Sequence, residues 1–205
     1  MRMTNLSKLF AAAILLSAGP LILNAQKPSG HPYYPLALGN TWRYFVRQSG
    51  RGGRESKVVW RVTKMDTAKS GRVIYQVWPT PMQADDEAMQ LTISDSRLEE
   101  VSTRMLVLRL ALSSGDQWSA RNGSQKGQAN QAFKVISVGQ PCWADSTYFL
   151  DCAVVEELDP SAKMRTVTTY AKGVGPVEYR YFRMKPSSKE ETLQTVTLRS
   201  YTIRP

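Results

Sequence analysis

Apolar residues recur at every second position along most of the chain, which is the period of a β-strand with one buried face. In the first such segment, Trp42, Tyr44 and Val46 alternate with their neighbours after a Gly39–Asn40 turn. The same strand character is found at residues 57–64, 72–78, 89–93, 97–101, 104–112, 132–138, 147–158, 164–170, 176–185 and 191–204. No segment after residue 25 has the period of an amphipathic helix. The predicted fold class is therefore all-β: an antiparallel meander of about ten strands that forms a curled sheet, a half-barrel or barrel, or a sandwich.

Two turns that precede tryptophans share a sequence pattern. Leu-Ala-Leu is followed by Gly-Asn-Thr-Trp in residues 36–42, and by Ser-Ser-Gly-Asp-Gln-Trp in residues 110–118. Glycine adopts the left-handed backbone that such a turn requires, and asparagine and aspartate tolerate it. We interpret the two copies as one device used twice, in which a glycine turn delivers Trp42 and Trp118 into the core.

The last predicted strand contains a break in its apolar pattern. Apolar residues up to Leu198 occupy one parity, whereas Tyr201 and the following apolar residue occupy the other. A β-bulge places one extra residue in a strand and so moves the following side chains to the opposite face. We therefore expect a bulge near Arg199 or Ser200.

Residues 1–25 have the features of a secretory signal peptide. Arg2 and Lys8 form a basic start, Leu9–Leu23 is largely apolar, and Ala25 is a small residue suited to cleavage. No cysteine lies near this position, which excludes a lipid anchor on an N-terminal cysteine. The expected organisation is a signal peptide at 1–25, a flexible leader at 26–32 and a single all-β domain at 33–205.

The signal predicts export to the periplasm or the cell exterior. After cleavage, no apolar stretch is long enough to span a bilayer, so the mature chain is expected not to span a membrane. An uncut signal that anchors the chain is the alternative. Removing Arg2 and Lys8 lowers the net charge from +10 to +8. This excess favours polyanions in general, but we interpret it as an ordinary basic surface without a dedicated partner.

The two cysteines, Cys142 and Cys152, are expected to form a disulfide, which is the default in an oxidising compartment. A separation of ten residues suits neighbouring strands or a long hairpin. The chain has no CxxC redox spacing, and its single histidine, His31, argues against a zinc site. We therefore expect a structural bridge, and neither a metal nor a cofactor.

Catalytic chemistry finds little support in the sequence. His31 falls in the predicted leader and is interpreted as a surface residue, and no GxSxG elbow is present. The adjacent carboxylates at 99–100, 156–157 and 190–191 cannot act together, because neighbouring strand residues point to opposite faces. We therefore expect no catalytic residues and a protein that is not an enzyme.

Several segments together resemble a widespread class of exported bacterial β-proteins grouped as domains of unknown function. The opening PLALGNTWRY is similar to the PLxxGNxWxY start of that class, and YAKGVGPVEY is similar to its YAxGVGxV segment near the C-terminus. The resemblance continues through residues 113–118, the Cys-bearing FLDCAVVEE at 149–157, and LRSYTI at 198–203. Where many relatives carry an Ala-Gly-x-Phe turn before the Cys-bearing strand, this chain has Ser146-Thr147-Tyr148-Phe149. The resemblance implies an all-β exported domain and brings no catalytic residues.

Two binding hypotheses follow from the side chains of the predicted strands. In the first, the curled sheet encloses an apolar or lipid-like ligand, with walls formed by Trp42, Tyr44, Trp60 and Tyr75. In the second, the protein is a cell-envelope scaffold or a polyanion-binding module that contacts an anionic envelope component. Its contact residues would be the cations of a C-terminal hairpin rich in aromatic residues: Lys172, Arg180, Arg183 and Lys185. We expect no specific nucleic acid as a partner.

Overall fold

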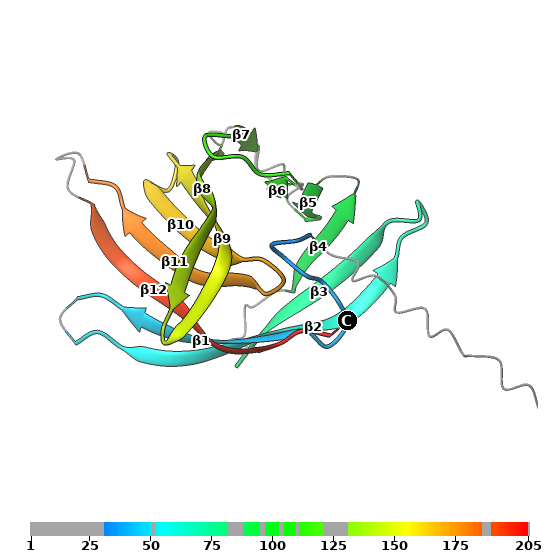
Figure 1. Ribbon diagram of the computed structural model, residues 1–205, viewed down its shortest axis with the longest axis horizontal. Coiled ribbons are helices and arrows are strands. Elements are labelled where there is room, and N and C mark those ends of the chain that lie inside the picture. The colour runs from blue at the N-terminus through cyan, green and yellow to red at the C-terminus, as the bar shows by residue number, and fades with distance from the viewer. Residues whose placement is uncertain are drawn as a thin grey trace, which may run out of the picture.

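A computed structural model gives the arrangement of the chain (Figure 1). It describes residues 31–50, 52–81, 88–94, 97–102, 105–109, 111–120, 131–185 and 190–204. The predicted signal peptide and most of the predicted leader lie outside these residues and stay predictions. In the part of the chain that is described, no helix is long and apolar enough to cross a membrane.

The described chain forms one antiparallel sheet of twelve strands. The strands are β1 (Thr41–Gln48), β2 (Glu55–Thr67), β3 (Val73–Thr80), β4 (Met89–Ser94), β5 (Arg97–Glu100), β6 (Met105–Arg109), β7 (Gln117–Ala120), β8 (Gln131–Ala144), β9 (Thr147–Asp159), β10 (Met164–Ala171), β11 (Gly175–Arg183) and β12 (Glu191–Thr202). The predicted all-β meander is confirmed. The expected number of about ten was too low, mainly because β7 has only four residues and is too short to show an alternating pattern.

The sheet is curled into a nearly closed barrel (Figure 1). Each strand pairs with the next along the chain except at β6 and β7, while β1 and β12 pair at the centre of the sheet. The two edge strands meet at a seam that side chains bridge: the indole N–H of Trp118 donates to the carbonyl oxygen of Leu106 at 3.0 Å. The guanidinium of Arg109 lies 5.6 Å from the centre of the Trp118 ring.

The N-terminal segment from His31 to Asn40 lies within the curl (Figure 1). The side chains of Tyr33, Tyr34 and Leu36 are at most 7% exposed. The ring of Tyr34 contacts those of Trp42, at 5.8 Å, and of Tyr170, at 6.3 Å. This segment therefore supplies part of the core itself and fills the half of the interior next to the start of β1.

His31 is buried, with 1% of its surface exposed, so its interpretation as a surface residue was wrong. Its Nε2 lies 2.6 Å from the carbonyl oxygen of Arg109, and its Nδ1 accepts the backbone N–H of Tyr33 at 3.1 Å. These partners require the neutral tautomer with the proton on Nε2, and burial lowers the pKa of His31 below its ordinary value. His31 thus fastens the N-terminal segment to the edge strand β6.

The two glycine turns use identical hydrogen bonds, which confirms that they are one device. The N–H of Gly39 donates to the carbonyl of Val62, whose own N–H donates to the carbonyl of residue 40. Gly115 and Val135 repeat the pattern through the carbonyl of residue 116. Both glycines have positive φ, 87° and 91°, and both following tryptophans are buried.

Two further local predictions are confirmed. The register of β1 against β12 shifts between Arg43, which faces Ser200, and Tyr44, which faces Leu198, so Arg199 is the bulged residue. Cys142 of β8 and Cys152 of β9 form the expected disulfide, with their Cα atoms 6.1 Å apart. The β8–β9 hairpin runs on beyond the turn between β10 and β11 toward β12 and β1 (Figure 1).

Candidate functional site

A cavity of about 490 Å³ opens on the concave face of the sheet, at the end where β1 leads into β2. The N-terminal segment fills the other end of the interior, where it contacts the start of β1. The wall of the cavity is mostly apolar and aromatic: Val46, Val58, Trp60, Pro79, Pro81, Tyr179, Tyr181 and Val196. Its remaining lining residues are polar: Gln48, Ser56, Lys57 and Gln194. The arrangement suits a ligand with an apolar body and a polar end.

Three aromatic rings build the floor of this cavity. The ring centres of Trp60 and Tyr179 lie 6.2 Å apart, and those of Tyr179 and Tyr181 lie 6.3 Å apart in a stacked arrangement. Tyr44 packs behind them, edge-on to both Trp60 and Tyr179, and its hydroxyl donates to the carbonyl of Pro176 at 2.8 Å. Burial raises the pKa of Tyr44 and Tyr179 well above the ordinary tyrosine value, so both phenols are neutral.

Glu157 is a carboxyl on the same concave face. The register of the sheet places Glu157 of β9, Thr166 of β10 and Tyr181 of β11 side by side. Burial, followed by the charge of Asp159, raises the pKa of Glu157 to about 7. Among the described residues it has no ion-pair partner. A neutral acid therefore lies beside the aromatic floor below about pH 7.

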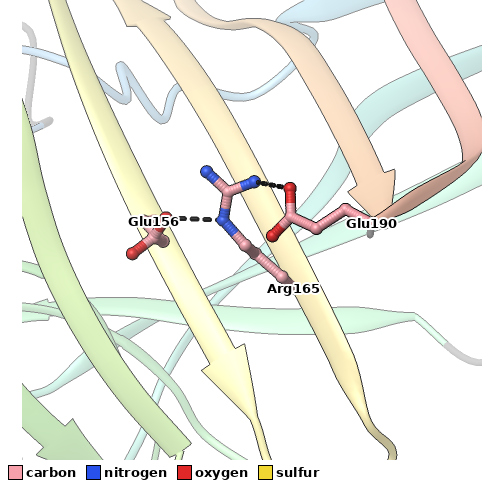
Figure 2. A network of polar contacts seen from close by, with 3 residues as sticks. All are labelled: Glu156, Arg165 and Glu190. Carbon is pink, nitrogen blue, oxygen red and sulfur yellow. Dashed lines mark hydrogen bonds and ion pairs between the residues drawn. The ribbon is translucent and has the colours of Figure 1, made fainter. Parts of the chain in front are cut away.

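The neighbouring Glu156 points to the convex face (Figure 2). Its carboxylate accepts the Nε–H of Arg165 at 2.6 Å, and Nη1 of the same guanidinium donates to Glu190 at 2.7 Å. The guanidinium also lies 4.9 Å from the centre of the Phe182 ring. Glu156 and Glu157 therefore serve opposite faces of β9, as expected for adjacent strand residues.

Of the four aromatic residues predicted to hold a ligand, the structure places one in the wall of the cavity, Trp60. Trp42, Tyr44 and Tyr75 are buried at 1–3% exposure. The indole N–H of Trp42 donates to the carbonyl of Val174 at 2.6 Å, which is a structural contact.

Sequence reasoning did not assign Tyr179 and Tyr181 to the cavity. The available signal was their shared parity on a strand, two residues apart, next to the predicted final strand. Because the same segment also carries arginines, it was assigned to a polyanion contact. In the structure, Tyr179 and Tyr181 line the concave cavity and Arg180 lies between them on the opposite face, whereas Arg183 has the same parity as the tyrosines.

Of the four cations predicted for a polyanion, Lys172 lies far from the other three. Lys172 lies in the β10–β11 turn and Arg183 at the far end of β11, about 26 Å away at the rise of a strand. Three of the four also have carboxylate partners: Lys172 pairs with Asp151 at 2.9 Å, Arg180 with Glu178 at 3.2 Å and Lys185 with Glu191 at 2.9 Å.

Possible metal and catalytic chemistry was also considered. Among the described residues, no group of three or more histidine, cysteine, aspartate or glutamate side chains could hold a metal ion. Both ring nitrogens of His31 are engaged in hydrogen bonds. The arrangement of described residues therefore offers a binding cavity, and the expectations about cofactors and catalysis stay predictions.

Comparisons with known proteins find similarity at the level of structures only. No protein-family model and no curated protein sequence matches the chain. A protein of Bacteroides fragilis, which its description proposes to be exported and assigns a YmcC-like fold, aligns with a TM-score of 0.49 and 12% identity, over 82% of this chain and 97% of that one. A protein of Parabacteroides distasonis, proposed to be a lipoprotein, aligns with a TM-score of 0.45 and 10% identity, over 84% and 99%. No family is shown for this chain.

Proposed function

We propose that this protein is an exported, non-enzymatic β-domain that binds an apolar or lipid-like ligand in the concave cavity of its sheet. The observation that supports the proposal most directly is the cavity of about 490 Å³ walled by Trp60, Tyr179 and Tyr181. Its volume falls in the range of about 300–1,000 Å³ that is typical of small-molecule sites in proteins.

The cavity lies in the part of the sheet's interior that the N-terminal segment does not occupy. At the other end of the interior, the N-terminal segment buries Tyr34 and Leu36 against the strands, so the curl encloses apolar surface along its whole length. An apolar ligand would cover Val46, Val58 and Trp60 in the same way, with a gain of about 25 cal/mol for each Å² removed from water.

The mouth of the cavity supplies polar contacts for the head of such a ligand. Gln48 and Gln194 offer amides and Ser56 a hydroxyl, all next to the β1–β2 turn. Glu157, whose pKa is raised to about 7, lies on the same face two strands away from Tyr181 and is not one of the lining residues. We infer that the ligand lies with its apolar part against the aromatic floor and its polar end toward this mouth.

The test compares two neighbouring valines of β2 that face opposite sides of the sheet. Val58→Trp places an indole in the cavity, whereas Val59→Trp adds the same volume on the convex face. Titration with the neutral apolar dye Nile red is expected to show saturable binding to the wild type and to V59W, and at least tenfold weaker binding to V58W. Equal affinity for V58W and the wild type, with both folded by circular dichroism, would refute the cavity as the binding site.

A further inference from the structure

A second hollow lies on the convex face of the same strands, behind the aromatic cavity. It has a volume of about 480 Å³ and is lined by Arg43, Phe45, Lys57, Val59, Arg199 and Ser200, and also by Tyr44 and Val58, whose side chains face the concave side. Strand alternation places the convex side chains of β1 here: Trp42, Tyr44 and Val46 point into the core, so the residues between them point outward. We call this hollow the convex groove.

Three cations are direct neighbours of Val59 on the convex face. Arg43 lies directly across from Val59 in the β1–β2 pairing, and Lys57 and Arg61 precede and follow it by two residues on the same face of β2. All three cations are exposed. Arg43 and Lys57 therefore line the groove next to its apolar residues Val59 and Phe45, and Arg61 lies beside it.

These three cations differ from the other cations of the same face. Arg47 pairs with Glu55, Lys64 with Asp66 and Arg180 with Glu178, at 2.8–3.2 Å. Within the described residues, no carboxylate lies at ion-pair distance from Arg43, Lys57 or Arg61. Among the described residues, Arg43 and Lys57 in the groove and Arg61 beside it are thus three neighbouring cations without an ion-pair partner.

The bulge of β12 shapes the wall of the groove. Arg199, the bulged residue, lays its guanidinium 5.0 Å from the centre of the Phe45 ring and forms an ion pair with Asp145 in the turn of the β8–β9 hairpin. Asp145 therefore neutralises Arg199 and holds it against Phe45. Arg199 is thus held in place, whereas the three cations next to Val59 have no ion-pair partner in the part of the chain that the structure describes.

We propose that the convex groove binds the phosphate headgroup of an anionic lipid. The phosphate would lie between Arg43, Lys57 and Arg61, because arginine matches phosphate oxygens with two parallel N–H donors and lysine adds a third charge. The adjoining glycerol and first methylenes would contact Phe45 and Val59. The groove combines cations with an apolar floor. This combination favours a lipid headgroup over a free inorganic anion, because an inorganic anion has no apolar group to contact Val59.

The experiment measures co-sedimentation of the purified protein with phosphatidylcholine vesicles, with and without phosphatidylglycerol. Binding is expected only to the vesicles that contain phosphatidylglycerol. Each cation near an anionic surface contributes about a fivefold gain in affinity, so the triple variant R43Q/K57Q/R61Q is expected to bind about 100-fold more weakly. The matched control R180Q/R183Q/K185Q removes the same charge from the β11 hairpin and is expected to lose less than fivefold.

Two further variants separate the groove from net charge and from folding defects. V59E keeps every cation but places a carboxylate next to them, and it is expected to abolish vesicle binding. R43K/R61K keeps the charge but loses the paired N–H donors, and it is expected to bind several-fold more weakly than the wild type. V58W, which fills the concave cavity, is expected to bind these vesicles like the wild type, so this proposal and the proposed function can fail separately.

Several results would overturn the proposal. Equal losses in the two triple variants would show that net charge alone attracts the protein. A larger loss in R180Q/R183Q/K185Q would place the contact on the hairpin. Complete displacement from vesicles by inorganic phosphate at a constant ionic strength would identify a free-phosphate site instead of a lipid headgroup site.

Discussion

Replacing Glu157 by glutamine is expected to stabilise the protein at alkaline pH. Burial beside Tyr181 raises the pKa of this carboxyl from its ordinary value of 4.5 to about 7. The folded state therefore holds a proton that the unfolded state has released between these two pH values. Because the folded state binds more protons there, the free energy of unfolding falls as the pH rises from about 4.5 to about 7.

The size of the effect follows from the shift. Each pKa unit corresponds to about 1.4 kcal/mol, so ionising Glu157 at pH 8 costs the folded state about 3 kcal/mol. Glutamine has the same shape and cannot ionise. Glu157→Gln should therefore raise the free energy of unfolding by up to about 3 kcal/mol at pH 8, and by close to zero below pH 4.5, where both side chains are neutral.

Urea unfolding followed by tryptophan fluorescence between pH 4 and pH 8.5 measures this difference directly. Comparing the variant with the wild type at each pH cancels the contributions of all other titrating groups, including His31. The matched control is Glu156→Gln, on the opposite face of the same strand. It breaks the ion pair with Arg165 and should lower stability by about 1 kcal/mol at pH 8.

One outcome would refute this reasoning about Glu157. If Glu157→Gln leaves the free energy of unfolding at pH 8 unchanged or lowers it, the carboxyl is ionised in the folded protein without penalty. The concave face beside Tyr181 would then be well solvated, which would also weaken the case for an apolar ligand in the adjoining cavity.

Three other predictions concern the segments that close the fold. His31 should contribute a fall in the free energy of unfolding as the pH drops below 6.5, opposite in sign to the effect of Glu157, because the unfolded state takes up a proton that the buried neutral His31 resists. This contribution should be absent from His31→Asn when the variant is compared with the wild type in urea titrations. Trp42→Phe leaves the buried carbonyl of Val174 without its donor and should lower the free energy of unfolding by about 2–3 kcal/mol. Trp143→Phe, at an exposed position, should lower it by less than about 0.5 kcal/mol in the same assay. Replacing Cys142 and Cys152 together by serine should lower the free energy of unfolding by about 3 kcal/mol. The urea midpoint of the variant should then lie below that of the oxidised wild type, and an unchanged midpoint would contradict this prediction.

Local sequence patterns were sufficient to predict most of the strands. Alternation identifies β1 because Trp42, Tyr44 and Val46 have to share the buried face, and the parity change after Leu198 required the bulge at Arg199. The glycine turns were also predictable, because few residues other than glycine adopt the backbone that Gly39 and Gly115 have.

The position of His31 could not be predicted in this way. Its burial depends on the curl of the whole sheet, which brings the carbonyl of Arg109, 78 residues away, next to its ring. A polar segment with two prolines near the start of a chain is ordinarily exposed, so local composition favoured a flexible leader. The contact between His31 and the carbonyl of Arg109 instead holds this residue in the interior.

The binding residues were difficult to predict for a related reason. Whether a cation has an ion-pair partner depends in part on the residue across from it: Arg47 faces Glu55, whereas Arg43 faces Val59 and Arg61 faces Thr41. The cavity likewise combines Trp60 with Tyr179, which are 119 positions apart in the sequence and are brought together when β12 pairs with β1. Strand register decides both cases, and alternation within single strands does not reveal it.

Native mass spectrometry of the purified protein, followed by denaturation and organic extraction, tests the central claim most directly. The account predicts a reproducible small molecule with an apolar part that is released from the wild type and V59W on unfolding, and its absence from V58W. An empty wild-type protein, or the same released molecule in equal amount from V58W, would contradict the claim that the concave cavity holds the ligand.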